Sequence, residues 1–506
     1  MRLELRGITK RFPGVLANDD VNFSVNTGEI VALLGENGAG KTTLMNILYG
    51  LYSHDEGEIL LDGEPLELAE PSDAIAAGIG MVHQHFMLVP VFTVAENVIL
   101  GVEPAGTAGW IDQKAAKNSV REISSRYSLE VDPDAIVEDL PVGVQQRVEI
   151  IKVLLREARF VVFDEPTAVL TPQEVDAFFE ILAGLKADGK GIVFITHKLK
   201  EPLEVADRIV VMRDGRTVGE VAPSDVDEDG LAELMVGRPV ELVVEKSASA
   251  AIEPVLVIDR LTVLDDRDQV AVDDVSFSVK AGEIVGIAGV QGNGQTELVE
   301  SITGLRPSVA GTVFIGDEDV TGASPRHIHR MAVAHVPEDR QKSGLVLSFT
   351  IFENMVLDSY YDRPFSRGVQ MDWGEVRKAA DRLVKEYEVK TPAIDVPLSS
   401  LSGGNQQKVI VAREFNRDVK LVIASQPTRG IDVGSIEYIH GRIVQERDEG
   451  AAVLIVSSEL DEVTALSDRL LVMFGGKVVA EFDPDTVTTH EIGLAMLGSA
   501  PADIST

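Results

Sequence analysis

The chain has 506 residues, 45% of them hydrophobic, and a length that suits roughly two to four domains. It contains no cysteine, which excludes disulfides, iron–sulfur clusters and cysteine-ligated zinc and favours a cytosolic protein. The formal net charge of −36 opposes binding to DNA, to RNA or to an anionic membrane, although adaptation to high salt or simple solubility explains it more economically. We find no apolar signal segment or membrane-spanning run, so we expect any membrane role to depend on a partner.

The first distinctive element is a strand, a loop and a helix. An apolar strand at 29–34 leads into Gly35-Glu-Asn-Gly-Ala-Gly-Lys41-Thr42, and a helical pattern follows from Thr43. This is the pattern G-x-x-x-x-G-K-[ST] in its required setting. The glycines let backbone N–H groups face an anion, Lys41 is expected to reach the β- and γ-phosphates, and Thr42 offers a hydroxyl to Mg²⁺. The loop predicts nucleotide binding through Gly35, Asn37, Gly38, Gly40, Lys41, Thr42 and Thr43.

The rest of this half alternates helices and strands. Residues 95–158 have mainly helical patterns and predict a helical subdomain. Apolar runs at 160–163, 191–195 and 208–212 alternate with further helical patterns, which predicts a largely parallel α/β core. Asp164-Glu165 follows the first of these runs. Open α/β sheets bind ligands at the carboxyl ends of their strands, so we expect both carboxylates beside the nucleotide. The alternative is that the pair only begins a turn.

The chain then repeats itself. Residues 17–30 recur as residues 271–284 at an offset of 254, and LPVGVQQRVEI at 140–150 recurs as LSGGNQQKVIV at 401–411, at an offset of 261. The second copy therefore has seven extra residues, which we place around Asp358–Trp373.

This repeat predicts two domains. They span residues 1–240 and 254–506, and residues 241–253 form a short linker without a basic run.

The phosphate loop, LSGGNQQK, FDEPT and THK occur in the same order in both halves, in intact or altered form. Together they resemble the ATP-binding subunits of ABC transporters, over nearly the whole chain. The resemblance implies two tandem P-loop (RecA-like) α/β ATPase domains, each with a helical signature subdomain and an N-terminal antiparallel β-subdomain. It also implies ATP and Mg²⁺ as cofactors, each nucleotide lying between the phosphate loop of one domain and the signature helix of the other.

The family motifs imply a role for each matching residue. Asp164 would hold Mg²⁺ through water, together with Thr42 and Gln84, and Gln84 would also couple to the permease. Glu165 would be the general base on the attacking water, and His197 would contact the γ-phosphate; with Lys41 and Gln84 they would form the catalytic set. Phe12 would stack on adenine.

The second half has lost most of these groups. Glutamine cannot act as a base, and each charged hydrogen bond lost with the lysine is worth about 1.5–3 kcal/mol. The aligned pairs are Lys41 and Gln295, Thr42 and Thr296, Gln84 and Glu338, Asp164 and Ser425, Glu165 and Gln426, His197 and Ser458, and Phe12 and Asp266.

The signatures have diverged in the opposite direction. The second half keeps LSGGNQ, in which Ser402, Gly403 and Gly404 begin a helix and suit a γ-phosphate. The first half has Pro141 in place of the serine and Val142 in place of a glycine. Pairing the first phosphate loop with the second signature gives one complete site and leaves one degenerate site. We therefore predict an intramolecular head-to-tail arrangement with one hydrolytic site and one that binds nucleotide weakly or statically.

Two further motifs permit other interpretations. His83-x-His85 and His327-x-His329 have a spacing that could begin a zinc site, but without cysteine or a third ligand we favour a loop that faces the permease. Residues 337–344, PEDRQKSG, mix charges in a way that suits a docking groove.

The fused, asymmetric layout resembles carbohydrate-uptake importers, and VHQHFMLVPVFTVAENVILG with LPVGVQQRVEIIK resembles their nucleoside-uptake branch. The resemblance implies two permease subunits and an extracytoplasmic binding protein, at the cytoplasmic face of the cell membrane, with no nucleic acid partner and no direct membrane insertion. A monosaccharide such as ribose, xylose or galactose is the alternative substrate. A tandem-ATPase translation factor would carry a long basic linker and two intact sites, and a DNA-repair ATPase would carry zinc modules or coiled coils; the chain has none of these.

Overall fold

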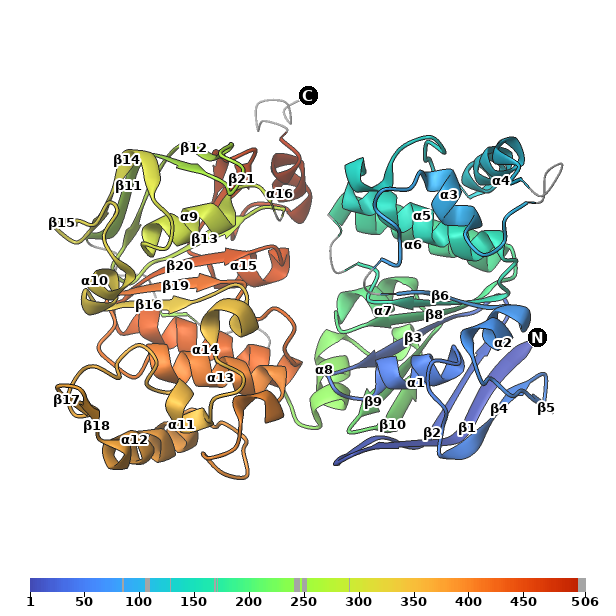
Figure 1. Cartoon of the computed structure of the whole chain (residues 1–506), viewed down its shortest axis with the longest axis horizontal. Helices are drawn as coiled ribbons and strands as arrows, with labels where there is room; N and C mark the ends of the chain where they lie inside the picture. The colour runs from blue at the N-terminus through green and yellow to red at the C-terminus, as the bar shows by residue number, and fades with distance from the viewer. Residues whose placement is uncertain are drawn as a thin grey trace. The chain divides into compact units, whose positions relative to one another are not determined.

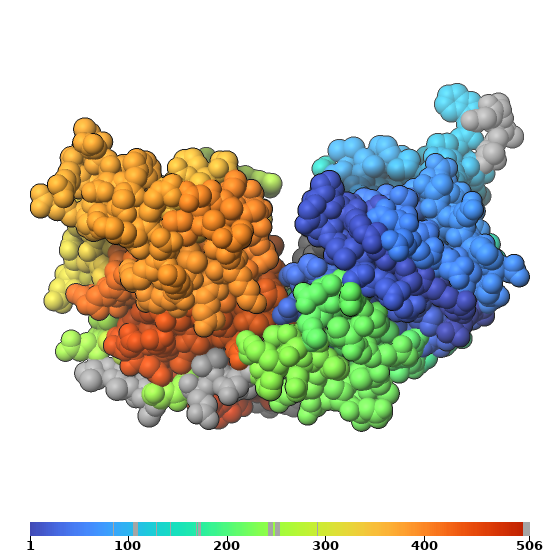
Figure 2. Space-filling model, turned by 90° about the horizontal axis from the view of Figure 1, so that it is seen from below, coloured from blue at the N-terminus to red at the C-terminus, as the bar shows by residue number. Residues whose placement is uncertain are grey.

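The computed structural model describes residues 1–83, 86–104, 110–127, 129–167, 170, 172–240, 246–247, 253–290 and 292–498. The chain divides into two compact units, Met1–Val240 and Glu241–Thr506. Figure 1 labels the elements of each unit, and Figure 2 shows their surfaces, coloured from blue to green in the first unit and from yellow-green to red in the second. Throughout the described residues, every helix is too short or too polar to cross a bilayer.

The first unit begins with an antiparallel sheet in the order β2-β1-β4-β5. Side chains alternate between the core and solvent along β1, where Leu3 and Leu5 are fully buried. This sheet confirms the antiparallel β-subdomain that the family resemblance implied. Its strands are β1 (Arg2–Phe12), β2 (Val15–Asn26), β4 (Glu56–Leu61) and β5 (Glu64–Pro65).

A second, mainly parallel sheet has the order β10-β9-β3-β8-β7-β6, and only the edge strand β10 runs antiparallel to its neighbour. The central strands are buried along their whole length, as expected for apolar runs that are covered on both faces. The strands are β3 (Ile30–Gly35), β6 (Ile79–Val82), β7 (Phe160–Asp164), β8 (Gly191–Thr196), β9 (Arg208–Arg213) and β10 (Arg216–Val221).

The helices of the first unit include the predicted helical subdomain, in which α3, α4 and α5 contact one another. Thr93 and Glu96 form a capping box at the start of α3, and Asp112 caps α4. The helices are α1 (Lys41–Leu48), α2 (Pro71–Ala76), α3 (Val94–Ile99), α4 (Gln113–Arg126), α5 (Val142–Leu155), α6 (Pro172–Ala187), α7 (Lys200–Val205) and α8 (Glu228–Val236).

The second unit repeats this plan, with sheets in the orders β12-β11-β14-β15 and β16-β19-β20-β13-β21-β22. Its strands are β11 (Pro254–Leu264), β12 (Val270–Lys280), β13 (Ile284–Ala288), β14 (Ser308–Ile315), β15 (Glu318–Asp319), β16 (Val333–Val336), β19 (Leu421–Ser425), β20 (Ala452–Ser457), β21 (Arg469–Phe474) and β22 (Lys477–Phe482). Its helices are α9 (Gln295–Ile302), α10 (Pro325–Arg330), α11 (Ile351–Asn354), α12 (Trp373–Glu386), α13 (Gly403–Glu414), α14 (Val433–Asp448), α15 (Leu460–Leu466) and α16 (Thr489–Met496).

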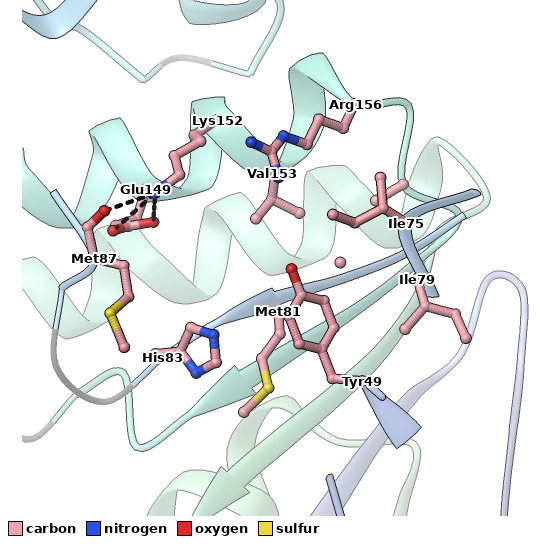
Figure 3. A pocket seen from close by; sticks show the side chains of 12 residues that line it. Tyr49, Ile75, Ile79, Met81, His83, Met87, Glu149, Lys152, Val153 and Arg156 are labelled. Atoms are coloured by element: carbon pink, nitrogen blue, oxygen red, sulfur yellow. Dashed lines mark hydrogen bonds and ion pairs between the residues drawn. The ribbon is translucent and has the colours of Figure 1, made fainter. Parts of the chain in front are cut away.

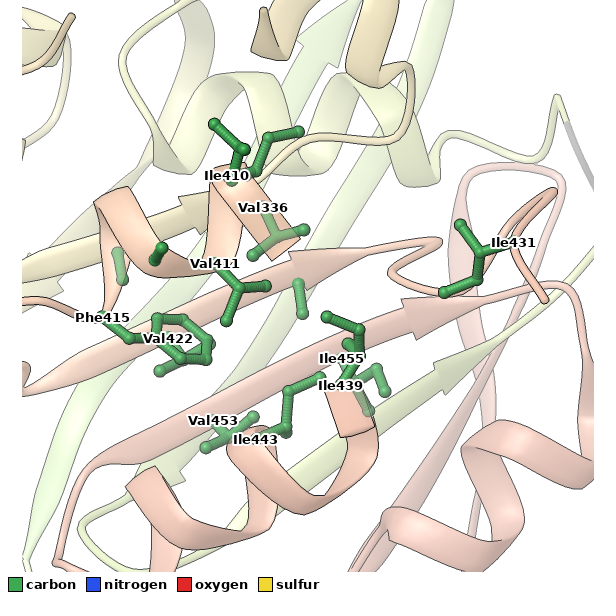
Figure 4. Packing of buried hydrophobic residues seen from close by; sticks show 14 of the residues in the cluster. Val336, Ile410, Val411, Phe415, Val422, Ile431, Ile439, Ile443, Val453 and Ile455 are labelled. Carbon is green, nitrogen blue, oxygen red and sulfur yellow. The ribbon is translucent and has the colours of Figure 1, made fainter. Parts of the chain in front are cut away.

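Helices α13 and α14 cover one face of the parallel sheet of the second unit (Figure 4). Aliphatic side chains from both helices pack against the strands and are buried, which stabilises the unit chiefly through the removal of apolar surface from water. The residues that meet there include Val411, Phe415, Ile439, Ile443, Val422, Val453 and Ile455.

A small hairpin, β17 (Ser366–Arg367) and β18 (Gln370–Met371), lies in the segment where the seven extra residues were expected. The described residues of the first unit form no corresponding hairpin. The segment packs onto α10, because the guanidinium of Arg326 lies 4.0 Å from the ring centroid of Tyr361.

Candidate functional site

The phosphate loop of the first unit joins β3 to α1. Gly38 and Gly40 have φ values of +88° and +94°, a conformation that favours glycine. A Cβ at Gly35 would lie 2.4 Å from the carbonyl oxygen of Met212, so only glycine fits there. Helix α1 begins without a side-chain cap, which leaves its first N–H groups facing the loop. This backbone forms an anion cradle, as predicted for a nucleotide phosphate.

Lys41 lies buried inside this cradle. Its Nζ donates to the carbonyl oxygens of Gly35, at 2.7 Å, and Glu36, at 3.0 Å. Burial lowers the pKa of Lys41, while the charges of Glu165 and Asp164 act in the opposite direction. The ammonium group is therefore held at the loop by neutral acceptors that a phosphate can replace.

The sheet brings Glu165 and His197 together, although they are 32 residues apart in sequence. Glu165 follows β7 and His197 follows β8, and these strands are neighbours. Glu165 has a φ of +46°, and its N–H donates to the carbonyl oxygen of Ile195 at 3.0 Å. Nδ1 of His197 lies 3.1 Å from Oε1 of Glu165. Burial alone would raise the pKa of Glu165, but the hydrogen bond and charge of His197, together with Lys41, lower it. The carboxylate is thus ionised and able to accept a proton.

The pKa of Asp164, at the end of β7, is shifted in the opposite direction. Burial and the neighbouring charge of Glu165 raise the pKa of Asp164 to about 6, although Lys41 and a hydrogen bond from Thr42 act to lower it. The hydroxyl and the carboxylate are the hard oxygen donors that Mg²⁺ prefers, and this buried carboxylate is short of positive charge. The residues therefore fit a magnesium ion. Gln84, the third predicted ligand and the predicted coupling residue, lies outside the described residues.

Asn37, Thr43 and Phe12 are also predicted nucleotide contacts, and like the other predicted contacts they remain predictions. Asn37 lies in the loop, and Thr43 lies in the first turn of α1. The ring of Phe12 lies at the end of β1, is 36% exposed, and makes an edge-on contact with Tyr52 at a centroid distance of 5.5 Å. Tyr52 was not anticipated from the sequence.

The signature of the second unit begins α13. Ser402 is its N-cap, and the hydroxyl accepts hydrogen bonds from the backbone and side chain of Asn405. Gly403 and Gly404 form the first turn, and a Cβ at Gly404 would lie 2.1 Å from Oγ of Ser435. In the first unit, Pro141 precedes α5 and makes no side-chain cap.

The counterpart site of the second unit has the same backbone with different side chains. Gln295 lies where Lys41 lies, at the start of α9. Gln426 has a φ of +47°, and its Oε1 accepts a hydrogen bond from Oγ of Ser458 at 3.1 Å. Thr296 donates to Oε2 of Glu338 at 2.9 Å. Ser425 ends β19, as Asp164 ends β7.

The segment 337–344 makes several hydrogen bonds within its own unit, and its role as a docking groove remains a prediction. Asp339 caps a helical turn at Arg340–Gly344, and Arg340 donates to the carbonyl oxygens of Arg429, at 2.6 Å, and Gly430, at 3.1 Å. Sequence reasoning missed Arg429 and gave Arg340 no role of its own within the segment 337–344. The available signal was that Arg429 aligns with an alanine in the first half.

Both histidines of the second pair contact carboxylates, whereas His83 of the first pair makes an edge-on ring contact with Tyr49. His327 lies 2.6 Å from Glu318, and His329 lies 3.1 Å from Asp358. No cluster of three or more potential metal ligands occurs within the described residues. His85 lies outside them.

A pocket of about 170 Å³ lies beside His83 in the first unit (Figure 3). Its walls are partly apolar, with Tyr49, Met81 and Met87, and one end carries Lys152, which donates to the carbonyl oxygen of Met87 at 2.8 Å. His83 directly precedes Gln84, the predicted coupling residue, in the sequence.

Comparisons with known proteins identify the family of this chain. The family model described as ABC transporter matches residues 18–168 and 272–429. The chain is 50% identical over 497 residues to the guanosine import ATP-binding protein of Bacillus subtilis, covering 98% of this chain and 97% of that one. It is 49% identical over 496 residues to the nucleoside import ATP-binding protein of Lactococcus lactis, covering 98% of each. It is 46% identical over 529 residues to the glucose import ATP-binding protein of Haloferax volcanii, covering 99% of this chain and 96% of that one.

Among solved structures, an archaeal ribosome recycling factor in complex with a ribosomal stalk protein has a TM-score of 0.64 at 22% identity, over 97% of this chain and 92% of that one. This similarity shows the fold alone.

The fold of the two units and the phosphate loop of the first unit define the class of this chain, the tandem P-loop nucleotide-binding proteins. The chain belongs to the ABC transporter family, as an ATP-binding subunit of the import type, and is an ATPase coupled to transport.

Proposed function

We propose that this chain powers a nucleoside importer, and that its ATP is hydrolysed at one composite site. The phosphate loop of the first unit and the signature helix of the second unit would form that site. The observation that carries the proposal is the grouping of Lys41, Glu165 and His197 in the first unit, where the second unit has only neutral amides and a hydroxyl. The two relatives named for guanosine and nucleoside import, at 50% and 49% identity, support the choice of substrate.

The chemistry follows from the first unit. Glu165 would take a proton from the water that attacks the γ-phosphorus, since its carboxylate is ionised and held by His197. Lys41 would exchange its two carbonyl acceptors for phosphate oxygens, and this charge-assisted contact strengthens as negative charge develops. Thr42, Asp164 and Gln84 would hold Mg²⁺, which neutralises phosphate charge when bound. Ser402, Gly403 and Gly404 would contact the γ-phosphate.

Two permease subunits and an extracytoplasmic binding protein would complete the importer, at the cytoplasmic face of the membrane. We place the contact of the first unit with a permease at the pocket beside His83. Its combination of an apolar wall with Glu149 and Lys152 suits a short amphipathic segment of the permease.

Uptake of labelled substrates tests the proposal. Cells without the gene for this chain should lose uptake of labelled guanosine and adenosine but keep uptake of ribose and glucose. The wild-type chain should restore nucleoside uptake and Glu165→Gln should not. Loss of sugar uptake alone would show that the transported substrate is a monosaccharide and not a nucleoside. The 46% identical relative named for glucose import supports this alternative.

A further inference from the structure

The described residues of the second phosphate loop, 289–290 and 292–296, keep the conformation of an anion site. Gly292 and Gly294 have φ values of +91° and +95°, close to those of the first loop, and α9 begins without a side-chain cap. A shape retained in this way presents backbone N–H groups to an anion. The cradle therefore survives the loss of the lysine.

A buried donor points into this cradle. Gln295 is only 7% exposed, and its Nε2 has no hydrogen-bond partner within the described part of the chain. A Cβ added at Gly289 would lie 2.5 Å from this nitrogen, so the amide lies across the first residue of the loop. Buried donors in folded proteins are almost always paired. An anion in the loop would supply the missing acceptor.

The same loop does not fit a magnesium ion. Both oxygens of Glu338 are engaged, because Oε2 accepts from the Thr296 hydroxyl at 2.9 Å and Oε1 accepts from Nη1 of Arg429 at 2.9 Å. The hydroxyl that corresponds to a metal ligand thus donates to a carboxylate that already carries a guanidinium counter-charge. With Ser425 and Gln426 in place of Asp164 and Glu165, little uncompensated negative charge is left to attract a divalent cation.

Arg429 brings a positive charge to the carboxylate of Glu338, the residue that aligns with the predicted metal ligand Gln84. Its backbone is held by Arg340, which donates to the Arg429 carbonyl oxygen at 2.6 Å. Its side chain is 54% exposed, so it can move towards a ligand. A guanidinium has five donors in a planar fork that matches phosphate oxygens, and Arg429 contacts Glu338 through Nη1.

We propose that the phosphate loop of the second unit binds a nucleoside di- or triphosphate without a divalent metal, with Gln295 in place of the lysine and the Arg429–Glu338 pair in place of the metal. This deepens the proposed function, on which it rests: the degenerate site keeps its nucleotide bound because it lacks both the metal and a base.

Counting nucleotide and metal on one sample tests the proposal. The full chain carrying Glu165→Gln is dialysed to equilibrium against millimolar labelled ATP and Mn²⁺, which replaces Mg²⁺ and is counted by electron paramagnetic resonance. The expected result is two nucleotides and one Mn²⁺ per chain. Equal numbers of nucleotide and Mn²⁺, whether two of each or one of each, would overturn the proposal.

Matched variants assign each count to a unit. Adding Lys41→Ala should leave one nucleotide and no Mn²⁺, and Mn²⁺ retained there would place the metal in the second unit and overturn the proposal. Arg429→Ala should weaken the remaining nucleotide about tenfold, with partial rescue by Arg429→Lys. The double change Glu338→Gln and Ser425→Asp, which restores the residues of the first unit, should add a second Mn²⁺.

Failure of the proposed function has a separate readout. If the proposed function is wrong, the Glu165→Gln variant should still hydrolyse ATP. The proposal of a metal-free second site is tested separately, by the number of Mn²⁺ ions bound per chain.

Discussion

The segments that follow β7 in the first unit and β19 in the second have nearly the same backbone conformation. Their side chains differ, because the first segment carries a carboxylate that can accept a proton and the second carries an amide that cannot. Glu165 and Gln426 have φ values of +46° and +47°, and their N–H groups donate to the neighbouring strand at 3.0 and 2.7 Å. The side-chain partners, His197 and Ser458, both lie at 3.1 Å. A base can thus be removed while the fold around it is kept, because the strained turn is stabilised by backbone contacts that do not depend on the side chain.

The surfaces beside the two loops differ in a similar way. The first unit has the pocket lined by Met81 and Lys152. At the aligned positions, the second unit has His335 and Arg413, and Nη1 of Arg413 donates to the carbonyl oxygen of Gly344 at 2.9 Å. Polar side chains therefore occupy these positions in the second unit, and Arg413 is hydrogen-bonded within that unit.

The largest expected effect on ATP turnover distinguishes Glu165 from Gln426, its counterpart in the second unit. Glu165→Gln should lower ATP turnover of the full chain by about 10²–10⁴-fold, because it removes the proton acceptor. Gln426→Ala should change turnover by less than about twofold. Steady-state phosphate release at saturating ATP measures both, and comparable losses from the two changes would end the asymmetric interpretation.

The second-largest effect should distinguish the phosphate loops of the two units by their contribution to ATP turnover. Lys41→Ala removes charged contacts worth about 1.5–3 kcal/mol each, so turnover should fall about 10- to 100-fold or more. Gln295→Ala should leave turnover nearly unchanged, since its loop is not the hydrolytic one. Both variants can be assayed beside wild type for ATP turnover, with circular dichroism as the control for folding. A larger loss from Gln295→Ala would reverse the assignment of the loops.

Exchanging signature residues should give a smaller effect. Gly403→Val introduces the residue of the first signature, and its Cβ would lie 2.8 Å from Nη2 of Arg340. We expect about a tenfold loss of turnover, since either the guanidinium of Arg340 or the first turn of α13 must shift. Pro141→Ser, the matched change in the first unit, should alter turnover by less than about twofold. If Pro141→Ser raised turnover severalfold, the first signature would also take part in hydrolysis.

The smallest effect concerns stability and pH. Burial, and to a lesser extent the charge of Arg413, lowers the pKa of His335 to about 4 from an ordinary value of 6.5. The unfolded chain binds a proton at this position near pH 6.5 and the folded chain only near pH 4, so stability is full above pH 6.5 and is lost as the pH falls towards 4. His335→Met, which introduces the residue of the first unit, should relieve about 1–2 kcal/mol of this loss at pH 5.

Thermal unfolding at pH 7.5 and pH 5 measures this relief. An unchanged pH dependence in His335→Met would contradict the assignment.

Much of the fold could be predicted because its signals are local. The apolar runs at 160–163, 191–195 and 208–212 became β7, β8 and β9, and the antiparallel sheets and parallel cores were confirmed. The helix of the phosphate loop begins at Lys41, two residues before the predicted start, because Gly40 already adopts the capping conformation. Catalytic roles of individual residues remain predictions.

By itself, the sequence determined that this chain binds a nucleotide phosphate, since one contiguous strand, loop and helix supply the whole cradle. It also determined which half lost its charged groups, because an internal repeat supplies its own reference. Only the tertiary structure decided which side chains meet. The pairs Glu165–His197, Thr296–Glu338 and Arg429–Glu338 join residues 32, 42 and 91 positions apart. Such contacts depend on strand order and loop closure, which no local pattern encodes.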